Sequence, residues 1–156
     1  MIKKIKKLFK IVTIDVLIYY KDKPSTISID LNEFKIIKKE IDSNKVKYYI
    51  LVNEQEIHQS FLFKKVYLQK LIKKKGPTIG DCKTAEAFKG KSIYPYVINH
   101  IANSELKEGI NEVFINVNPD NFASIRGIEK AGFKKYVHLK AKRFLFFYFN
   151  VNKDFF

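Results

Sequence analysis

The fold is decided by residues 79–96, which read IGDCKTAEAFKGKSIYPY. A strand is expected over residues 78–84, a basic loop over Lys89, Gly90 and Lys91, and a helix over residues 93–106. Backbone N–H groups at a helix start have no acceptor within the helix, and the helix dipole adds positive charge there. Gly90 also allows a ligand close to the backbone. The pattern therefore predicts a pyrophosphate site, and its alternative is a solvated basic turn.

Strands are expected around this stretch wherever β-branched and aromatic residues gather between turn residues. They are placed over residues 12–20, 26–29, 45–53, 56–71, 111–117, 133–140 and 143–151.

Two further helices follow from spacing and capping residues. Phe34, Ile37 and Ile41 share one helical face, so a helix is expected over residues 33–41, capped by Asp30 or Asn32. A second helix over residues 122–131 has Asn121 as its cap and Gly132 as its end. The order of elements predicts α+β architecture, with one domain over residues 1–156 around a central twisted mixed sheet flanked by helices.

The composition narrows the function. The formal net charge is +14, but only Arg126 and Arg143 are arginines. A positive field attracts anions such as nucleotides, whereas scarce arginine argues against base-specific nucleic-acid recognition. One cysteine, Cys82, excludes an intramolecular disulfide and a cysteine-based zinc cluster. The single cysteine also favours a reducing cytoplasm. The apolar run over residues 11–20 contains Asp15 and is too short to span a bilayer, so a strand is expected there, with peripheral membrane contact as the alternative.

Two motifs carry a resemblance to a known family. Residues 89–94 resemble the acetyl-CoA loop of the GNAT superfamily, in which Arg or Gln is followed by two residues, Gly, one residue, and Gly or Ala. Lys89 stands at the first position, Ser92 at the Gly and Tyr94 at the last. Residues 118–133, NPDNFASIRGIEKAGF, are similar to the GNAT segment after the fifth strand. The resemblance covers about residues 45–150.

The resemblance implies a GNAT-like fold whose fourth and fifth strands, here residues 78–84 and 111–117, splay apart around acetyl-CoA as cosubstrate. A backbone N–H around Asp81 to Cys82 would stabilise the oxyanion. The residues implied for acetyl-CoA binding are Cys82, Thr84, Lys89, Gly90, Lys91, Ser92, Ile93, Tyr94, Asn121 and Ser124.

The implied reaction is direct attack of a primary amine on the thioester, without a metal. A base must remove a proton from the amine, and the candidates are His58, Asp81 and Glu86; each is alternatively an ordinary polar residue. The family's thiolate-protonating Tyr is replaced by Ile128, so either Tyr94, Tyr96 or water is the proton donor, or the thiolate leaves unassisted. Cys82 is interpreted as a buried strand cysteine.

The acceptor implied by the resemblance is an amino sugar, carried on a nucleotide, in surface-polysaccharide synthesis. The expected partner is thus a small-molecule amine, with no nucleic acid and no membrane span, and the protein is expected to be a monomer or homodimer. Two alternatives stay open. One is a GNAT-fold module that binds CoA with weak or no catalysis, and the other is a basic nucleic-acid-binding protein.

Overall fold

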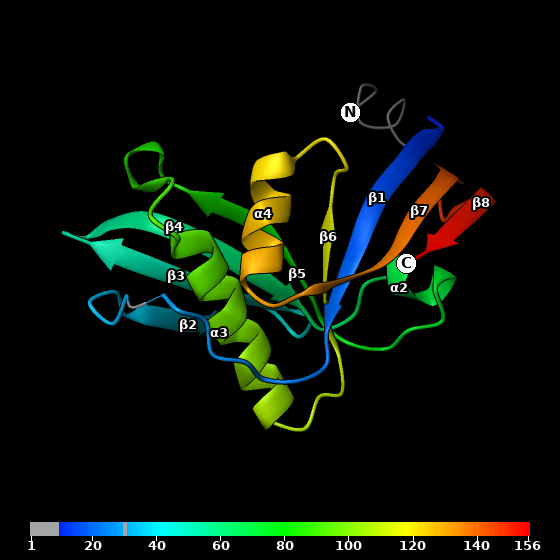
Figure 1. Ribbon diagram of the computed structural model, residues 1–156. Coiled ribbons are helices and arrows are strands. Elements are labelled where there is room, and N and C mark those ends of the chain that lie inside the picture. Colours follow the sequence, from blue (N-terminus) through cyan, green and yellow to red (C-terminus); the bar gives the residue numbers. More distant parts are fainter. Residues whose placement is uncertain (1–9, 30) are drawn as a thin grey trace.

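The computed structural model describes residues 10–29 and 31–156 (Figure 1). Within these residues, eight strands form one sheet in the order β2-β3-β4-β5-β6-β1-β7-β8. The strands are β1 (Val12–Lys21), β2 (Ile36–Glu40), β3 (Lys45–Val52), β4 (Gln55–Phe63), β5 (Thr78–Thr84), β6 (Val113–Val117), β7 (Lys134–Phe144) and β8 (Phe147–Phe155). The helices are α2 (Leu68–Leu71), α3 (Ile93–Lys107) and α4 (Phe122–Lys130), with a 3-10 turn η1 (Glu86–Phe88). The predicted α+β class with a mixed sheet is confirmed.

The sheet separates two hydrophobic cores, because successive side chains of a strand point to opposite faces. α3 and α4 cover one face (Figure 1), where Tyr19 and Ile115 pack with Val97 and Ile128. On the other face, Ile18 and other alternating strand residues pack against the segment that contains α2. The larger core thus lies beneath α3 and α4 and fixes their position on the sheet.

The first strand lies in the interior of the sheet. β1 pairs antiparallel with β6 on one side and with β7 on the other. Lys21, at the end of β1, is 2% exposed; its ammonium donates to Asn99 of α3 and, over 2.9 Å, to the carbonyl of Ala131. Burial lowers the pKa of Lys21 to about 8. The end of β1 therefore ties α3 to the end of α4.

Three predictions from the sequence are wrong. Residues 33–41 form no helix, since Ile36–Glu40 is the edge strand β2, which pairs with β3. A helical spacing over so few residues stabilises a helix only weakly. The β-branched isoleucines of this segment pair with β3 instead. Residues 26–29 are a loop. Ser25, which precedes this loop, is held to α3 by reciprocal hydrogen bonds between its backbone and the side chain of Asn103. The strand expected over 56–71 ends at Phe63.

The other elements form near the predicted places, except that the last turn is displaced. The break expected at residues 141–142 lies within β7, and residues 145–146 form the turn. β5 spans Thr78–Thr84 and α3 begins at Ile93, as expected. Because β2 adds a strand, the two strands predicted to splay are the fifth and sixth of this chain. Asp30, one proposed cap, and residues 1–9 lie outside the described residues. Within the described part of the chain, no helix is long and apolar enough to cross a membrane.

Candidate functional site

The two parallel strands at the centre of the sheet stay together only briefly. β5 and β6 pair at Thr78 with Phe114 and at Ile79 with Ile115, and their ladder ends there. β5 continues to Thr84 and β6 to Val117. From Gly80 onward, the side of β5 that faces β6 has no strand partner in the described residues. A polar backbone edge is thereby opened in the middle of the sheet, where an extended ligand can pair with it.

A β-bulge lies in this unpaired part of β5. Gln59 of β4 pairs with Lys83 and Phe61 pairs with Gly80, so Asp81 and Cys82 together stand opposite Ser60. Asp81 adopts a φ of 49°, in the left-handed region that few residues other than glycine, asparagine and aspartate occupy. A bulge removes a residue from the ladder and re-aims its neighbours. Backbone groups at positions 81–82 are therefore turned out of regular pairing at the point where the two strands diverge.

α3 begins without a side-chain cap. Its N-terminal residue, Ser92, has a φ of 62° and makes no capping hydrogen bond, and the first helical bond runs from Tyr96 N–H to the Ser92 carbonyl. Pro95 has no N–H, so Ile93 and Tyr94 supply the N–H groups of the first turn. Gly90, with a φ of 75°, has open space around the position of a Cβ. The start of α3 is thus accessible to a ligand.

α4 begins nearby with its N-terminus capped. The Asn121 Oδ1 accepts a hydrogen bond from the Ser124 N–H over 3.1 Å, as a capping asparagine does. Farther along α4, the Lys130 ammonium donates to the Ser92 hydroxyl over 2.8 Å. The ring of Tyr94 lies so close to Gly127 that a Cβ there would approach a ring carbon to 2.6 Å. α3 and α4 are therefore joined along one face, with Tyr94 between them.

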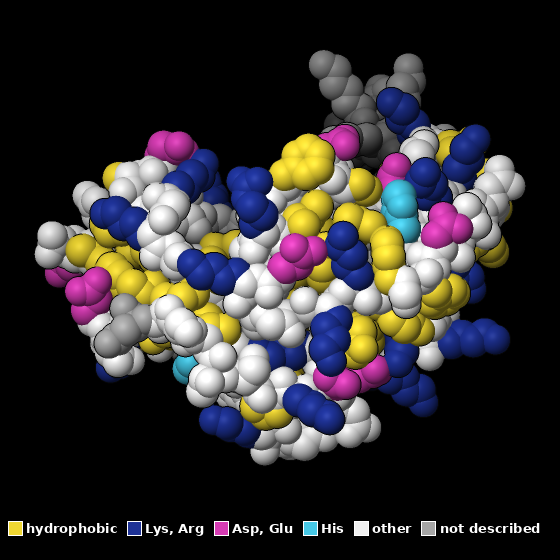
Figure 2. All heavy atoms as spheres, viewed as in Figure 1, with side chains coloured by type: hydrophobic (Ala, Val, Ile, Leu, Met, Phe, Trp, Pro, Cys, Tyr) yellow, Lys and Arg dark blue, Asp and Glu magenta, His cyan; other side chains and the backbone are white. Residues whose placement is uncertain are grey.

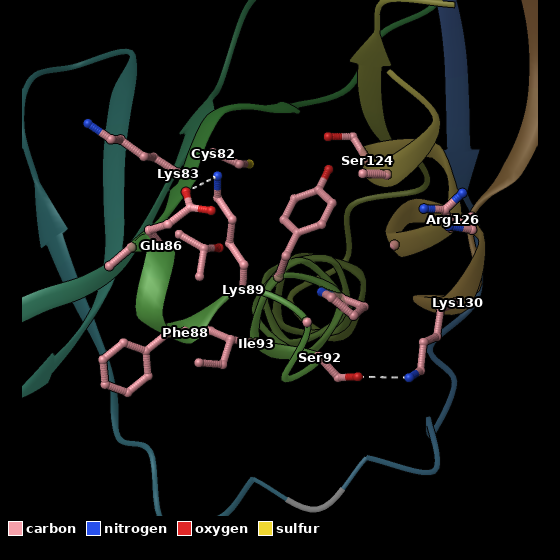
Figure 3. A pocket seen from close by; sticks show the side chains of 17 residues that line it. Cys82, Lys83, Glu86, Phe88, Lys89, Ser92, Ile93, Ser124, Arg126 and Lys130 are labelled. Carbon is pink, nitrogen blue, oxygen red and sulfur yellow. Dashed lines mark hydrogen bonds and ion pairs between the residues drawn. The ribbon is translucent and has the colours of Figure 1, made fainter. Parts of the chain in front are cut away.

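A pocket of about 760 Å³ lies where these features meet. Its walls come from β5, the loop after β5, the first turn of α3 and one face of α4, and Figure 3 shows Cys82 and Ser124 on opposite walls at one end. Basic side chains gather on both sides of the notch between the loop and α4 (Figure 2). The lining residues that carry charge are Lys83, Glu86, Lys89, Arg126 and Lys130.

The charge of the pocket is positive, with four basic residues against one acidic residue among those that line it. Its one carboxylate, Glu86, lies 2.5 Å from the Lys89 ammonium (Figure 3). Both side chains are exposed, so this ion pair contributes little to stability. A positive pocket beside free helix N–H groups favours a phosphorylated ligand.

Behind the pocket wall, a buried histidine joins two residues that line the pocket. His58 is 1% exposed; its Nδ1 lies 2.8 Å from the Thr84 Oγ1 and its Nε2 lies 2.8 Å from the Ser60 Oγ. The Ser60 hydroxyl in turn hydrogen-bonds Cys82. Burial lowers the pKa of His58 to about 4, so the imidazole is neutral at pH 7. The chain of contacts holds Thr84 and Cys82 in fixed positions.

Burial also shifts the pKa values of two side chains that line the pocket, Cys82 and Tyr94. Burial raises the pKa of the Cys82 thiol to about 12, against a smaller lowering by Ser60, so Cys82 remains a thiol at neutral pH. Burial also raises the pKa of the Tyr94 hydroxyl far above its usual range. Tyr94 is therefore protonated at neutral pH, and its hydroxyl is a hydrogen-bond donor on the pocket wall.

The structure brings most of the predicted site residues together. The predicted residues that line the pocket are Cys82, Thr84, Glu86, Lys89, Gly90, Ser92, Ile93, Tyr94 and Ser124. Asn121 and Lys91 lie outside the lining; Asn121 caps α4 and the Lys91 ammonium lies over the Phe88 ring. His58 reaches the pocket only through its neighbours. Asp81 is exposed and lies 3.6 Å from the Lys45 ammonium.

On α4, Ser124 was predicted, but four further lining residues were missed. Ala123, Arg126, Gly127 and Lys130 line the pocket together with Ser124. Their spacing of three, one and three residues places them on one helical face, and this spacing was the signal available in the sequence. Ile128 is fully buried in the core. Tyr96 and His100 line a separate pocket of about 390 Å³ on α3.

Comparisons with known proteins do not assign this chain to a family. No protein-family model matches it, and no curated protein is significantly similar to it.

Proposed function

We propose that this protein is a GNAT-type N-acetyltransferase that transfers acetyl from acetyl-CoA to a primary amine. The observation that carries the proposal is the divergence of β5 and β6 beside the uncapped start of α3. These two features offer a strand edge for the pantetheine arm and N–H groups for the pyrophosphate, in one positive pocket. The resemblance of residues 79–96 and 118–133 to the GNAT signatures supports the same conclusion.

In the proposed complex, the chain supplies position and charge. The N–H groups of Ile93 and Tyr94 and the backbone at Gly90 bind the pyrophosphate, with Lys89 and Arg126 as neighbouring cations. The open edge of β5 pairs with the pantetheine amides, as a strand would. Acetyl-CoA then lies with its thioester near the bulge at Asp81–Cys82, where a freed backbone N–H stabilises the oxyanion. Alignment of two substrates in this way accounts for a large rate enhancement.

The proton transfers require a base and an acid. With a pKa of about 4, His58 is a weak base at neutral pH, and we assign it a positioning role toward Thr84 and Ser60. Glu86 is the carboxylate that lines the pocket, and we propose that it accepts the amine proton through water. Tyr94, whose hydroxyl stays protonated, is proposed to donate a hydrogen bond to the leaving thiolate, which then takes its proton from water.

The acceptor is proposed to approach from the opposite face of the sheet. Asn116 follows the last residue of β6 that pairs with β5, and strand alternation points its side chain away from α3 and α4. Its Oδ1 is buried and, among the described residues, has no hydrogen-bond partner. An unpartnered buried acceptor favours a ligand that donates a hydrogen bond. A nucleotide-linked amino sugar supplies such donors, and its diphosphate suits a net charge of +14.

The first test is binding of acetyl-CoA. Ligand at about 100 times its dissociation constant stabilises a protein by roughly 2.7 kcal/mol, which raises the melting temperature of a chain of this size by roughly 5 to 10 °C. Absence of any shift at millimolar acetyl-CoA, in a folded sample, contradicts the proposal. The second test measures thiol release with amino-sugar nucleotides, polyamines, aminoglycosides, amino acids and basic peptides. Turnover of a peptide or polyamine with every amino sugar inert rejects the acceptor class alone.

A module that binds CoA without turnover is the second candidate function. It is favoured by the burial of Ile128 at the family's tyrosine position and by the low basicity of His58. Binding of acetyl-CoA with no turnover of any amine would support this candidate. Any residual release of thiol should then be the same in Tyr94→Phe and Glu86→Gln as in the wild type.

A further inference from the structure

The turn between the last two strands carries exposed phenylalanines. β7 ends at Phe144 and β8 begins at Phe147, so two residues form the turn. We call residues 144–149 the hairpin tip. At its end, Phe146 is 76% exposed and Phe147 is 72% exposed. Exposed hydrophobic side chains that lie close together often mark an interaction site.

The start of β1 extends the same apolar surface. Val12 pairs with Arg143, which places the beginning of β1 beside the hairpin tip (Figure 1). Ile11 is 53% exposed and Val12 is 40% exposed. Two elements that are far apart in the sequence therefore present apolar side chains at one corner of the sheet, beyond the end covered by α3 and α4.

Basic residues surround this corner. Within the described residues, those that are exposed there are Lys10, Lys140, Lys142 and Arg143, and Figure 2 shows Lys and Arg side chains gathered at this corner. The sequence holds no Asp or Glu from Leu139 to Lys153. The nearest acidic residue on β1, Asp15, accepts a hydrogen bond from His138 over 2.6 Å. Asp15 also stands opposite Lys140 in the ladder. The corner thus combines apolar tips with an excess of positive charge.

The strand register places Lys142 on the same face as the phenylalanines, whereas Arg143 and its partner Val12 project from the other face of the tip. Lys142 pairs with Phe149, and Phe144 pairs with Phe147. Since directly paired residues of antiparallel strands point to the same face, the lysine and the phenylalanines project together. A side chain such as lysine can then reach a charged surface while its aromatic neighbours enter an apolar layer.

We propose that the hairpin tip and the start of β1 dock on an anionic lipid bilayer. The phenylalanines at the turn would enter the interface between headgroups and acyl chains, and the four basic residues would contact the headgroup phosphates. The positive charge of the corner and the net charge of +14 complement an anionic surface. The inference is independent of the proposed acetyl transfer and concerns only where the protein is held.

Other occupants fit the same corner less well. A second copy could pair with the edge strand β8, but this pairing would leave Ile11 and Val12 uncovered, because β7 lies between β1 and β8. A nucleic acid would suit the charge and the aromatic rings, but the aliphatic Ile11 and Val12 offer it no stacking surface. A bilayer uses both the aliphatic and the aromatic side chains.

The test is cosedimentation of the full chain with vesicles of phosphatidylcholine containing about 30% phosphatidylglycerol, and with phosphatidylcholine alone. The expected result is binding to the anionic vesicles at least tenfold tighter than to neutral ones, because each basic residue contributes about fivefold. Phe146→Ser with Phe147→Ser should weaken this binding at least tenfold. The control is Phe122→Ser, which removes an equally exposed phenylalanine, 65% exposed, from α4 and should bind as the wild type does.

Three results would overturn the proposal. The first is an absence of binding to anionic vesicles, and the second is equal loss in the tip variant and the Phe122→Ser control. The third is self-association in sedimentation, or binding of a single-stranded oligonucleotide, that the tip variant abolishes while vesicle binding persists. Far-ultraviolet circular dichroism and melting temperature, unchanged in the variants, exclude misfolding as the cause of a loss.

Discussion

The N-termini of α3 and α4 lie beside the same pocket, but only the N-terminus of α4 has a side-chain cap. At α4, Asn121 accepts the Ser124 N–H, so the protein itself satisfies the helix start. At α3, Ser92 sits in a left-handed conformation and gives no side-chain cap. Its hydroxyl is directed instead to Lys130 of α4.

The cap of α4 has a structural role, and we propose that the uncapped N-terminus of α3 binds a ligand. An uncapped N-terminus leaves N–H groups that need acceptors, and the surrounding basic residues favour a negatively charged acceptor. A chain that required only stability would place Asn, Asp, Ser or Thr at α3 in a capping conformation. Ser92 is present but turned away, which supports a role for the open start in binding.

The largest expected effect comes from a carboxylate at the open start. Gly90→Glu should weaken acetyl-CoA binding about 1000-fold, or roughly 4 kcal/mol, because its charge would lie where the pyrophosphate is proposed to bind. Titration calorimetry measures the affinity.

Gly109→Glu is the matched control for this variant. Gly109 has a φ of 97°, Gly90 has a φ of 75°, and both have open space at the Cβ position, so backbone strain and charge change alike. Gly109 follows the opposite end of α3, and its variant should bind acetyl-CoA as the wild type does. Equal affinities of the two variants would refute the assignment of the open start.

The second effect tests the pocket wall formed by Thr84 and Cys82, which the contacts of His58 hold in position. The folded-state pKa of His58 is about 4, below the unfolded value of about 6.5. Between these values the unfolded chain binds more protons, so stability is lost as the pH falls. The expected contribution is about 3 kcal/mol between pH 7 and pH 4, measured by denaturant unfolding. His58→Gln should lack this part of the pH dependence; an unchanged difference between the two pH values would contradict the buried neutral histidine.

The third effect concerns the contact that sets the distance between the two helices. A Cβ at residue 127 would lie 2.6 Å from a ring carbon of Tyr94, so Gly127→Ala should destabilise the fold by about 2 kcal/mol. This loss is expected although alanine has the better helix propensity. In a Tyr94→Leu background the loss should shrink, and a double-mutant cycle measures the coupling. Additive effects would mean that the ring does not limit the approach of α4.

The smallest effects compare the two cap positions directly. Asn121→Ala should cost about 1 kcal/mol of stability, because the Ser124 N–H loses its acceptor. Ser92→Gly should change stability by about 0.5 kcal/mol or less, since relief of the left-handed strain offsets the lost Lys130 contact and the added chain entropy. It should retain acetyl-CoA binding. Thermal unfolding of both variants checks the difference, and a larger loss at Ser92 than at Asn121 would reverse the comparison.

The region between β5 and α4 was predictable because its signals are local. Pro95 and Gly90 mark the start of α3, and Asn121 and Gly132 mark the two ends of α4. Such capping and turn preferences act through neighbouring backbone groups, so the sequence states them directly. Gly90 follows from these signals, whereas Thr84 and Ser124 were expected in the pocket only from the resemblance to the GNAT motifs.

The remaining features depend on contacts between distant residues. Phe34, Ile37 and Ile41 carry a helical spacing, but the pairing of Ile37 with Tyr49 decides the conformation of this segment. The burial of His58 likewise arises from packing between elements. No local preference encodes these contacts, so the sequence offered His58 as a candidate base where the structure has a buried, neutral side chain.

The place of β1 in the sheet has a consequence for the order in which the chain folds. Val16 must find Leu139, and Leu17 must find Val117, so each of these pairings closes a loop of about one hundred residues or more. A ribosome delivers the amino end first, yet this strand has no neighbour until most of the polypeptide has been synthesised. Completion of the sheet is therefore a late step of folding with slow kinetics. Until then the apolar strand depends on chaperones or on rapid collapse for protection from aggregation.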